Sequence, residues 1–343
     1  MKRWVTLLLC MYAALIHARA PSREVVLYNW SEYMDPAILR DFESETGIHV
    51  TEIHYDSDEG KEELLALNGG AGMDVVLTSA VSLPGYALAG WIRPLDALEG
   101  DAAMLAWSER YPGVNARLGL PLLWGTVGIA YRRDQVAPPT SWLALFRPDP
   151  SLDGRIMLID DMKDTFGLAL KALGYSLNSV DPEQNQEAAR LLERLKTHRP
   201  ILDYPALNAD NVLSRGRVTL AMVYNGDGLV LQQLDERLAF VVPEEGTNLW
   251  LDTVALLKAA PHPEDALVFI RYLARPDVAA RLSRYTRCAT ANPEAEALLP
   301  ENFRKNPLIY PPADIRARSE GFRPLPPAIL RQRQAAFNRL RNP

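Results

Sequence analysis

Short runs rich in β-branched and aromatic residues alternate, from Val25 onward, with longer stretches that carry apolar residues at helical spacing. This alternation predicts strands and helices in turn, at residues 25–28, 35–45, 48–54, 61–67 and 74–77. Gly47 and Gly69 stand just past the two predicted helices, where a residue that tolerates positive φ ends a helix. This order of elements predicts right-handed βαβ units around a parallel sheet.

The same alternation restarts after a stretch punctuated by prolines at 138–150. We predict further strands at 155–159, 218–224, 238–242 and 254–257, and helices at 162–173, 183–197, 264–273 and 327–341. Two α/β halves, with late elements returning to the first, predict two lobes, each a mostly parallel sheet flanked by helices, with a ligand cleft between them. The lobes are expected at 24–128 plus 252–296 and at 129–251 plus 297–343.

The first twenty residues have the three-part pattern of a secretory signal peptide. Lys2 and Arg3 precede an apolar run over residues 4–16, and Ala18-Arg19-Ala20 has the A-x-A form of a cleavage site. The run is shorter than the roughly 20 residues that span a bilayer, which disfavours the alternative of an uncleaved anchor. We therefore predict a signal peptide at 1–20 and a mature protein secreted to the periplasm.

Without residues 1–20 the chain keeps 323 residues, a length that favours two domains. It then carries 34 Lys and Arg against 43 Asp and Glu, a net charge of −9. An acidic balance disfavours nucleic acid and anionic membranes as partners and is compatible with a cationic ligand. Cys288 is the one cysteine left, so we expect no internal disulfide, which suits a bacterial periplasm better than a small disulfide-built module.

The common sequence signatures of catalysis are absent. The chain contains no glycine-rich phosphate loop, no G-x-S-x-G elbow and no H-E-x-x-H metal motif. His49 and His54 share a predicted strand, but a separation of five residues places them on opposite faces. We therefore predict that the protein is not an enzyme and needs no cofactor or metal.

Aromatic residues stand beside acidic residues at the ends of three predicted strands. These segments are Asn29-Trp30-Ser31-Glu32-Tyr33, Tyr224-Asn225-Gly226-Asp227 and Trp250-Leu251-Asp252. A carboxylate takes charge-assisted hydrogen bonds from an ammonium group, while an aromatic face adds cation–π attraction and packs against methylenes. The alternative is that the rings belong to the core and the acids are solvated. Three such pairs at three strand ends favour a site for an organic amine.

Asp161 and Asp164 stand where the predicted strand at 155–159 gives way to the helix at 162–173. Asp161 fits the N-cap position and Asp164 the N3 position of an acidic capping box. A structural role in starting the helix is therefore as well supported as ligand binding. The two roles are compatible, because backbone N–H groups and the helix dipole would hold these carboxylates ionised, ready to meet an ammonium group.

With these residues the chain resembles the spermidine/putrescine-binding periplasmic proteins that serve polyamine ABC transporters. The resemblance runs over nearly the whole mature sequence and includes the segments 27–33, 42–47, 74–76, 123–125, 160–161, 173–176, 224–226 and 250–252. The N-W-x-E-Y opening and the later W-x-D are specific in combination. The resemblance implies the type II periplasmic binding fold, in which two α/β lobes close over the ligand.

The resemblance also implies which residues bind the ligand. They are Trp30, Ser31, Glu32, Tyr33, Ser79, Asp161, Asp164, Tyr224, Trp250 and Asp252. Asp161 and Asp164 would receive one end of the polyamine. Tyr224, where the family usually has Trp, and Trp250 would sandwich the methylene chain. Asp252 would bind an interior or terminal amine.

Three positions depart from the family pattern. Val81 stands where an aromatic residue is frequent, Cys288 replaces a tyrosine that lines the ligand, and Arg323 falls near a position where an amide side chain is common. These differences remove aromatic side chains from the family's ligand site and bring a positive charge toward a site that binds a cation. They bear on the length and affinity of the ligand and on polyamine binding itself, but not on the fold.

The leading hypothesis is a monomeric periplasmic protein that binds a polyamine and delivers it to the permease of an ABC transporter. An alternative is a sensor that docks on the periplasmic domain of a membrane receptor, for example one controlling cyclic-di-GMP, because an altered pocket suits a different task. An enzyme such as a polyamine-modifying hydrolase is a third hypothesis, disfavoured because no nucleophile–base pair or metal cluster is evident. The sequence leaves open which polyamine binds.

Overall fold

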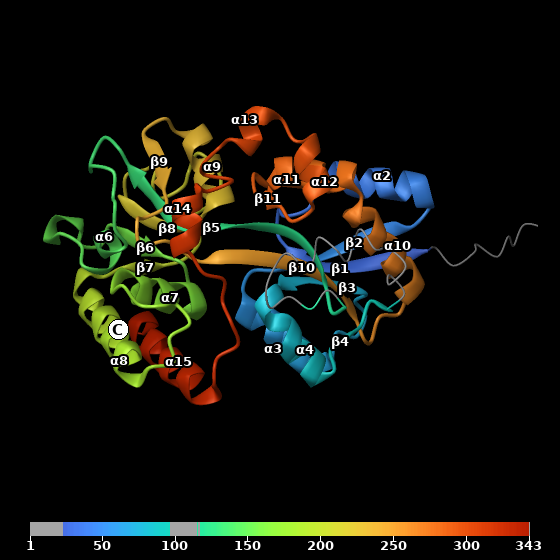
Figure 1. Cartoon of the computed structure of the whole chain (residues 1–343), viewed down its shortest axis with the longest axis horizontal. Helices are drawn as coiled ribbons and strands as arrows, with labels where there is room; N and C mark the ends of the chain where they lie inside the picture. The colour runs from blue at the N-terminus through green and yellow to red at the C-terminus, as the bar shows by residue number, and fades with distance from the viewer. Residues whose placement is uncertain (1–22, 97–114, 116, 343) are drawn as a thin grey trace, which may run out of the picture.

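The computed structural model describes residues 23–96, 115 and 117–342. It has two α/β lobes joined by two long strands, β5 (Leu120–Arg132) and β10 (Leu249–Leu257), which cross the middle of the molecule in Figure 1. The predicted signal peptide at 1–20 lies outside the described residues. Within those residues, none of the helices combines the length and the apolar character that a bilayer crossing requires.

The first lobe is built on a parallel core of three strands in the order β2-β1-β3, to which β10 and β5 are added antiparallel. The strands belonging to this lobe alone are β1 (Glu24–Trp30), β2 (His49–Tyr55), β3 (Val75–Ser79), β4 (Ile92–Arg93) and β11 (Ala289–Thr290). The helices are α2 (Pro36–Thr46), α3 (Asp58–Asn68), α4 (Leu83–Ala89), α10 (Pro263–Ala274), α11 (Pro276–Thr286) and α12 (Pro293–Leu298), with a short 3₁₀ turn η1 (Ala80–Ser82). The predicted βαβ units are confirmed.

The second lobe repeats this plan with the parallel order β7-β6-β8, and β5 pairs antiparallel with both β8 and β9. Its strands are β6 (Ile156–Leu158), β7 (Ile201–Leu202), β8 (Leu220–Tyr224) and β9 (Leu238–Val241). Its helical elements are α6 (Leu143–Phe146), η3 (Pro150–Leu152), α7 (Met162–Ala172), α8 (Pro182–Leu195), η4 (Lys196–His198), α9 (Asn225–Leu234) and α15 (Pro327–Arg341). Two short helices, α13 (Glu301–Arg304) and α14 (Ala313–Arg318), precede α15.

Local capping explains why the first helix begins and ends where the sequence predicts. The Asp35 side chain accepts a hydrogen bond from the Ala37 N–H at 2.8 Å, which satisfies a donor that the helix itself leaves free. Gly47 ends α2 at a φ of 69°, in the left-handed region that glycine tolerates without steric cost. Its N–H donates to the Glu43 carbonyl at 2.8 Å. The helix ends at this point, and the chain continues into β2.

The strand β5 was missed by the sequence prediction, although it is the longest strand in the part of the chain that the structure describes. Its residues, LPLLWGTVGIAYR, are almost all buried, so no polar–apolar alternation marks it, and Pro121, Gly125 and Gly128 are typical breaks. Residues 120–126 pair with β10, whereas residues 127–132 pair with β8 and β9. One strand therefore belongs to both sheets.

Each lobe has its own hydrophobic core, and β5 contributes to both. Leucines within residues 120–123 pack into the core of the first lobe with Phe42. Apolar side chains within residues 127–131 pack into the core of the second lobe with Trp142. Trp250 of β10 is partly buried and packs against both cores. The junction of the two lobes is therefore a packed structure and not a loose linker.

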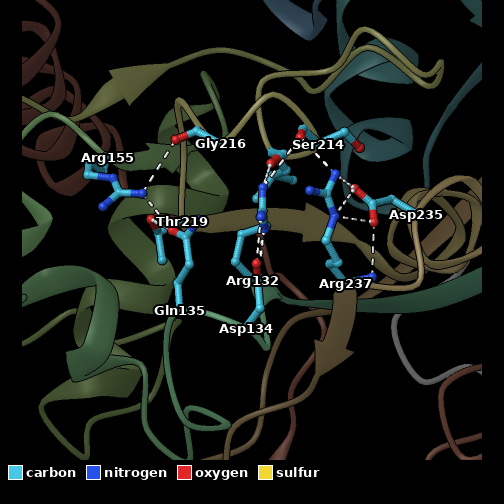
Figure 2. Close-up of polar contacts among 10 residues, drawn as sticks. Arg132, Asp134, Gln135, Arg155, Ser214, Gly216, Thr219, Asp235 and Arg237 are labelled. Atoms are coloured by element: carbon cyan, nitrogen blue, oxygen red, sulfur yellow. Dashed lines mark hydrogen bonds and ion pairs between the residues drawn. The ribbon is translucent and has the colours of Figure 1, made fainter.

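A polar network holds the far end of β5 within the second lobe (Figure 2). The buried Arg132 donates to both carboxylate oxygens of Asp134 and to the backbone carbonyls of Leu213 and Ser214. Arg237 donates to the same Ser214 carbonyl at 3.2 Å. These bonds tie the loop before β8 to the end of β5 and satisfy carbonyls that burial removes from water.

The last helix, α15, is tied to the second lobe by a buried arginine. Arg333 donates to the side-chain oxygen of Asn185 at 2.9 Å and to the carbonyls of Leu177 and Ser179 at 2.9 and 2.8 Å. Its guanidinium carbon lies 5.1 Å from the ring centre of Phe166. Burial lowers the pKa of Arg333 to about 10. The cation is stabilised by neutral oxygens and a ring.

Replacing Arg333 with alanine would remove a donor from three buried oxygens, of which the Ser179 carbonyl keeps its hydrogen bond from the Asn185 amide. A buried polar group without a partner costs about 1–3 kcal/mol, so we expect Arg333→Ala to lower the free energy of unfolding by about 3 kcal/mol or more. Arg331, exposed on the same helix, is the matched control, and Arg331→Ala should change it by less than about 0.5 kcal/mol. Urea denaturation measures both variants, and equal losses would contradict the anchoring role.

Candidate ligand-binding site

Tyr33 and Asp252 come from distant parts of the chain and meet at the edge of the first lobe. Tyr33 follows β1, and Asp252 lies in β10 opposite Ser79 of β3. The Tyr33 hydroxyl donates to Asp252 Oδ2 at 2.9 Å. Burial raises the pKa of Asp252 to about 6, against the opposing effects of this hydrogen bond and of the Lys61 charge. The Asp252 carboxylate is therefore one whose charge a bound cation would stabilise.

Asp161 and Asp164 lie at the start of α7, and the structure separates their roles. Asp161 is the N-cap and accepts a hydrogen bond from the Asp164 N–H at 2.9 Å, which confirms its predicted capping position. The Asp164 carboxylate accepts instead from the Tyr224 hydroxyl and the Asn248 amide, each at 2.8 Å. Burial and the neighbouring Asp161 charge raise the pKa of Asp164 to about 7. Helix capping therefore does not explain the Asp164 side chain.

Tyr224 and Trp250 form an aromatic corner beside Asp164. Their ring centroids are 6.2 Å apart and their planes meet at 83°, an edge-to-face arrangement. The Trp250 indole N–H donates to the Thr126 carbonyl at 3.2 Å, which fixes the ring against β5. The two rings thus give two perpendicular walls rather than two parallel ones.

Trp30, Ser31 and Glu32 follow one another at the end of β1. Trp30 is partly buried, and its ring centroid lies 4.5 Å from that of Tyr55. Ser31 and Glu32 are exposed in the turn that follows. Glu32 has a φ of 58°, a left-handed conformation that costs a non-glycine residue about 1–2 kcal/mol. Such backbone strain is found preferentially at functional turns.

A cluster of opposite charges, not foreseen from the sequence, joins the two lobes. Asp58 lies in the first turn of α3 and Lys163 in the first turn of α7, and Asp58 Oδ2 is 2.5 Å from Lys163 Nζ. Asp58 Oδ1 accepts from Lys61 Nζ at 2.6 Å. Burial acts to raise the pKa of Asp58, but the ammonium groups of Lys163 and Lys61 outweigh it and lower the pKa. One carboxylate is therefore shared by two ammonium groups where the lobes meet.

Two further polar residues belong to this region. Tyr204, just after β7, is partly buried, and burial together with the charges of Asp161 and Asp164 raises its pKa. Asp227, in the first turn of α9, has its pKa raised to about 7 by burial and by the charge of Glu32. Asp227 could have been inferred from its place in the segment 224–227, whereas nothing in the sequence around Tyr204 marks it.

The three positions that depart from the family pattern lie in different surroundings. Cys288 is buried, and its thiol donates to the Thr286 carbonyl at 3.3 Å. Val81 is partly buried in η1. Arg323 is exposed, and its backbone N–H donates to the Asn178 side chain at 2.8 Å. The structure therefore does not bury the Arg323 charge beside the carboxylates.

A separate cavity of about 200 Å³ opens on the second lobe, away from these residues. It is lined by Arg147, Leu173, Glu187, Arg190, Leu191 and Arg194. Three guanidinium groups make this cavity unsuitable for a cation. Across the described part of the chain, no three His, Cys, Asp or Glu side chains are grouped so that they could hold a metal ion.

Comparison with known proteins places this arrangement in a family. Residues 37–311 match the model of the bacterial extracellular solute-binding protein family. The chain belongs to this family. It is accordingly a solute-binding protein and not an enzyme, and its relatives include periplasmic proteins.

Two relatives and one solved structure cover nearly the whole solute-binding protein. A putrescine/agmatine-binding protein of Pseudomonas aeruginosa is 31% identical over 94% of this chain and 93% of its own length. A spermidine/putrescine-binding periplasmic protein of Escherichia coli is 30% identical, with 93% of each chain covered. A putative spermidine/putrescine ABC transporter structure from Listeria monocytogenes has a TM-score of 0.82 at 28% identity and covers 94% of this chain and 99% of its own. The predicted two-lobed periplasmic binding fold is confirmed.

The raised pKa of Asp227 predicts how the stability of this solute-binding protein depends on pH. The folded state holds the Asp227 proton up to about pH 7, whereas the unfolded chain releases it at the ordinary, lower pKa. The free energy of unfolding therefore falls as the pH rises through this interval. Asp227→Asn removes the cost, so at pH 8 we expect the unliganded variant to be more stable than wild type by about 2–4 kcal/mol.

This gain should shrink as the pH is lowered from 8 toward 4, because the wild-type side chain then keeps its proton in both states. Urea denaturation at several pH values measures it. Asp210→Asn, at an exposed aspartate, is the control and should change stability by less than about 0.5 kcal/mol at every pH. An Asp227→Asn variant no more stable than wild type at pH 8 would rule out an uncompensated carboxylate at this position.

Proposed function

We propose that this solute-binding protein binds a polyamine outside the cytoplasm and delivers it to the permease of an ABC transporter. The observation that carries the proposal is the set of partly or fully buried carboxylates beside aromatic rings, with Asp252 on the first-lobe side and Asp164 on the second. Burial removes water from both carboxylates and raises their pKa values, so a bound cation would stabilise the charged form of each. The names of the two relatives, a putrescine/agmatine-binding and a spermidine/putrescine-binding protein, support the same class of ligand.

The proposed site combines residues from both lobes. It comprises Trp30, Ser31, Glu32, Tyr33, Ser79, Asp161, Asp164, Tyr224, Trp250 and Asp252, to which we add Tyr204 and Asp227. Carboxylates on both sides would each receive an ammonium group in charge-assisted hydrogen bonds. The aromatic corner of Tyr224 and Trp250 would pack against the methylenes between those groups.

Several sequence predictions remain part of this proposal. They are the cleavage of a signal peptide after Ala20, the lobe bounds of 24–128 plus 252–296 and 129–251 plus 297–343, and a monomeric state. A sensor that docks on a membrane receptor stays a prediction based on the departures at Val81, Cys288 and Arg323. Transport is the function that we propose, because the relatives named for polyamine binding include a transporter structure.

Calorimetric titration of the purified protein with putrescine, agmatine, spermidine, norspermidine and spermine tests the proposed function. A ligand that binds only the folded state stabilises it by about 2.7 kcal/mol at one hundred times its Kd. We therefore expect heat of binding and a raised Tm with at least one of these amines. Unchanged melting curves across millimolar concentrations of all five would refute polyamine binding while leaving the family assignment intact.

Asp252 should contribute to binding without contributing much to the unliganded fold. Losing one partner of a desolvated charge pair costs about 2–5 kcal/mol, roughly thirty- to several-thousand-fold in affinity. Asp252→Asn preserves the shape and an acceptor for Tyr33, so it should weaken polyamine binding by that order without lowering the unliganded Tm. Calorimetry beside thermal melting checks both, and wild-type affinity in this variant would contradict the site.

Asp161 offers a contrast, because its carboxylate also caps α7. Asparagine is as good an N-cap as aspartate, whereas alanine loses about 1 kcal/mol. Asp161→Asn should therefore weaken binding with little loss of unliganded stability, and Asp161→Ala should show both losses. Equal affinity in Asp161→Asn and wild type would assign Asp161 to capping alone.

A further inference from the structure

Two lysine ammonium groups of the protein itself lie where an amine ligand would be expected. Lys61 is completely buried, and its Nζ lies 4.7 Å from the ring centre of Tyr55 and 6.0 Å from that of Trp30. This is the aromatic environment that would attract an ammonium group of a ligand. The Trp30 face is therefore already used by an internal cation.

The second ammonium group arrives from the opposite lobe. Lys163 Nζ contacts Asp58 Oδ2 at 2.5 Å, while Lys61 holds the other oxygen of the same carboxylate at 2.6 Å. The side chains of Lys163 and Asp58 are 28% and 16% exposed, so water screens the pair only in part. Together the three groups carry one net positive charge. A ligand ammonium group gains nothing from Asp58 in this arrangement.

Lys163 also acts on the carboxylates that remain. Asp58 and Asp161 hold the pKa of Lys163 well above its ordinary value, although burial opposes its charge. In return, Lys163 lowers the pKa that burial raises at Asp161, and it exerts a weaker effect of the same sign at Asp252. The Lys163 ammonium group thus stabilises part of the negative charge of Asp161 and Asp252. A ligand ammonium group would otherwise provide that stabilisation.

We infer that Lys61 and Lys163 are specificity-determining residues that fill one ammonium position of the site with the protein's own cations, and that they thereby favour a short diamine over a longer triamine. This inference rests on the proposed function, since it concerns which amine the same site takes. A triamine needs a third ammonium position. The end of the site between α3 and α7 could provide this third position, but Asp58, Lys61 and Lys163 occupy it.

Lys163→Met tests the inference by removing the charge while keeping a long apolar stem. Asp58 stays paired with Lys61, and Asp161 loses its internal cation, so a further ligand ammonium group can be accepted. Removing one unit charge at this range from the third amine should shift the ratio of Kd values, spermidine over putrescine, by about tenfold toward spermidine. Calorimetry with both amines measures the ratio.

Lys61→Met is a second, independent variant, because it empties the faces of Tyr55 and Trp30 while Lys163 keeps Asp58 paired. It should shift the ratio in the same direction. Lys305→Met is the matched control, since Lys305 pairs with Glu301 at the same 2.5 Å but on an exposed helix end, and its ratio should equal that of wild type. Thermal melting of each unliganded variant establishes that it is folded.

The outcomes separate this inference from the proposed function. Wild-type protein that binds both amines, with a ratio unchanged in folded Lys163→Met and Lys61→Met, overturns the inference and leaves polyamine binding standing. Wild-type protein that prefers spermidine over putrescine by tenfold or more overturns it as well, whether or not the variants fold. Wild-type protein that binds none of the five amines removes the proposed function and the inference with it.

Discussion

The structure depends on the close packing at Gly125, where β5 passes from one sheet to the other. A Cβ atom at this position would lie 2.1 Å from the Asn225 side-chain oxygen and 2.4 Å from the Trp250 ring, so no larger residue fits. The N–H of the next residue, Thr126, donates to the Asn225 side-chain oxygen, and its carbonyl accepts from the Trp250 indole N–H, each at 3.2 Å. The crossing therefore fixes the start of α9 and the ring that packs against both cores. Trp250, a residue of the proposed site, is therefore held by the same contacts that join the lobes.

Electrostatics gives the site its character once this frame is fixed. The carboxylates of Asp164 and Asp252 are removed from water but receive their hydrogen bonds from neutral hydroxyl and amide groups. Neutral donors compensate a buried charge only in part, which is why both pKa values rise. Asp58 differs, because two ammonium groups surround it and its pKa falls. The region where the lobes meet thus contains one carboxylate whose charge ammonium groups compensate and two whose charge only neutral donors compensate.

The parts of the fold that local sequence encodes were predicted from it, and the parts that depend on distant contacts were not. Asp35 and Gly47 mark the two ends of α2, because helix capping uses groups within a few residues of each other in the sequence. Asp161 was recognised in the same way. By contrast, β5 is buried on both faces and shows no alternation. Asp58 meets Lys163, 105 residues later in the sequence, only where the two lobes come together. Tyr204 likewise lies near Asp164 only in three dimensions.

The position of β10 has a consequence for how the chain reaches this structure. β10 pairs with β3, so that Val75 lies opposite Leu256, and with β5, so the first sheet lacks the strand between β3 and β5 until a segment late in the chain is available. Pairings of such high sequence separation raise the contact order and slow folding. A newly made chain therefore lacks the strand that joins β3 to β5 for most of its synthesis. For a chain that crosses a membrane before it folds, such a delay would keep the polypeptide in the unfolded form that a membrane pore admits.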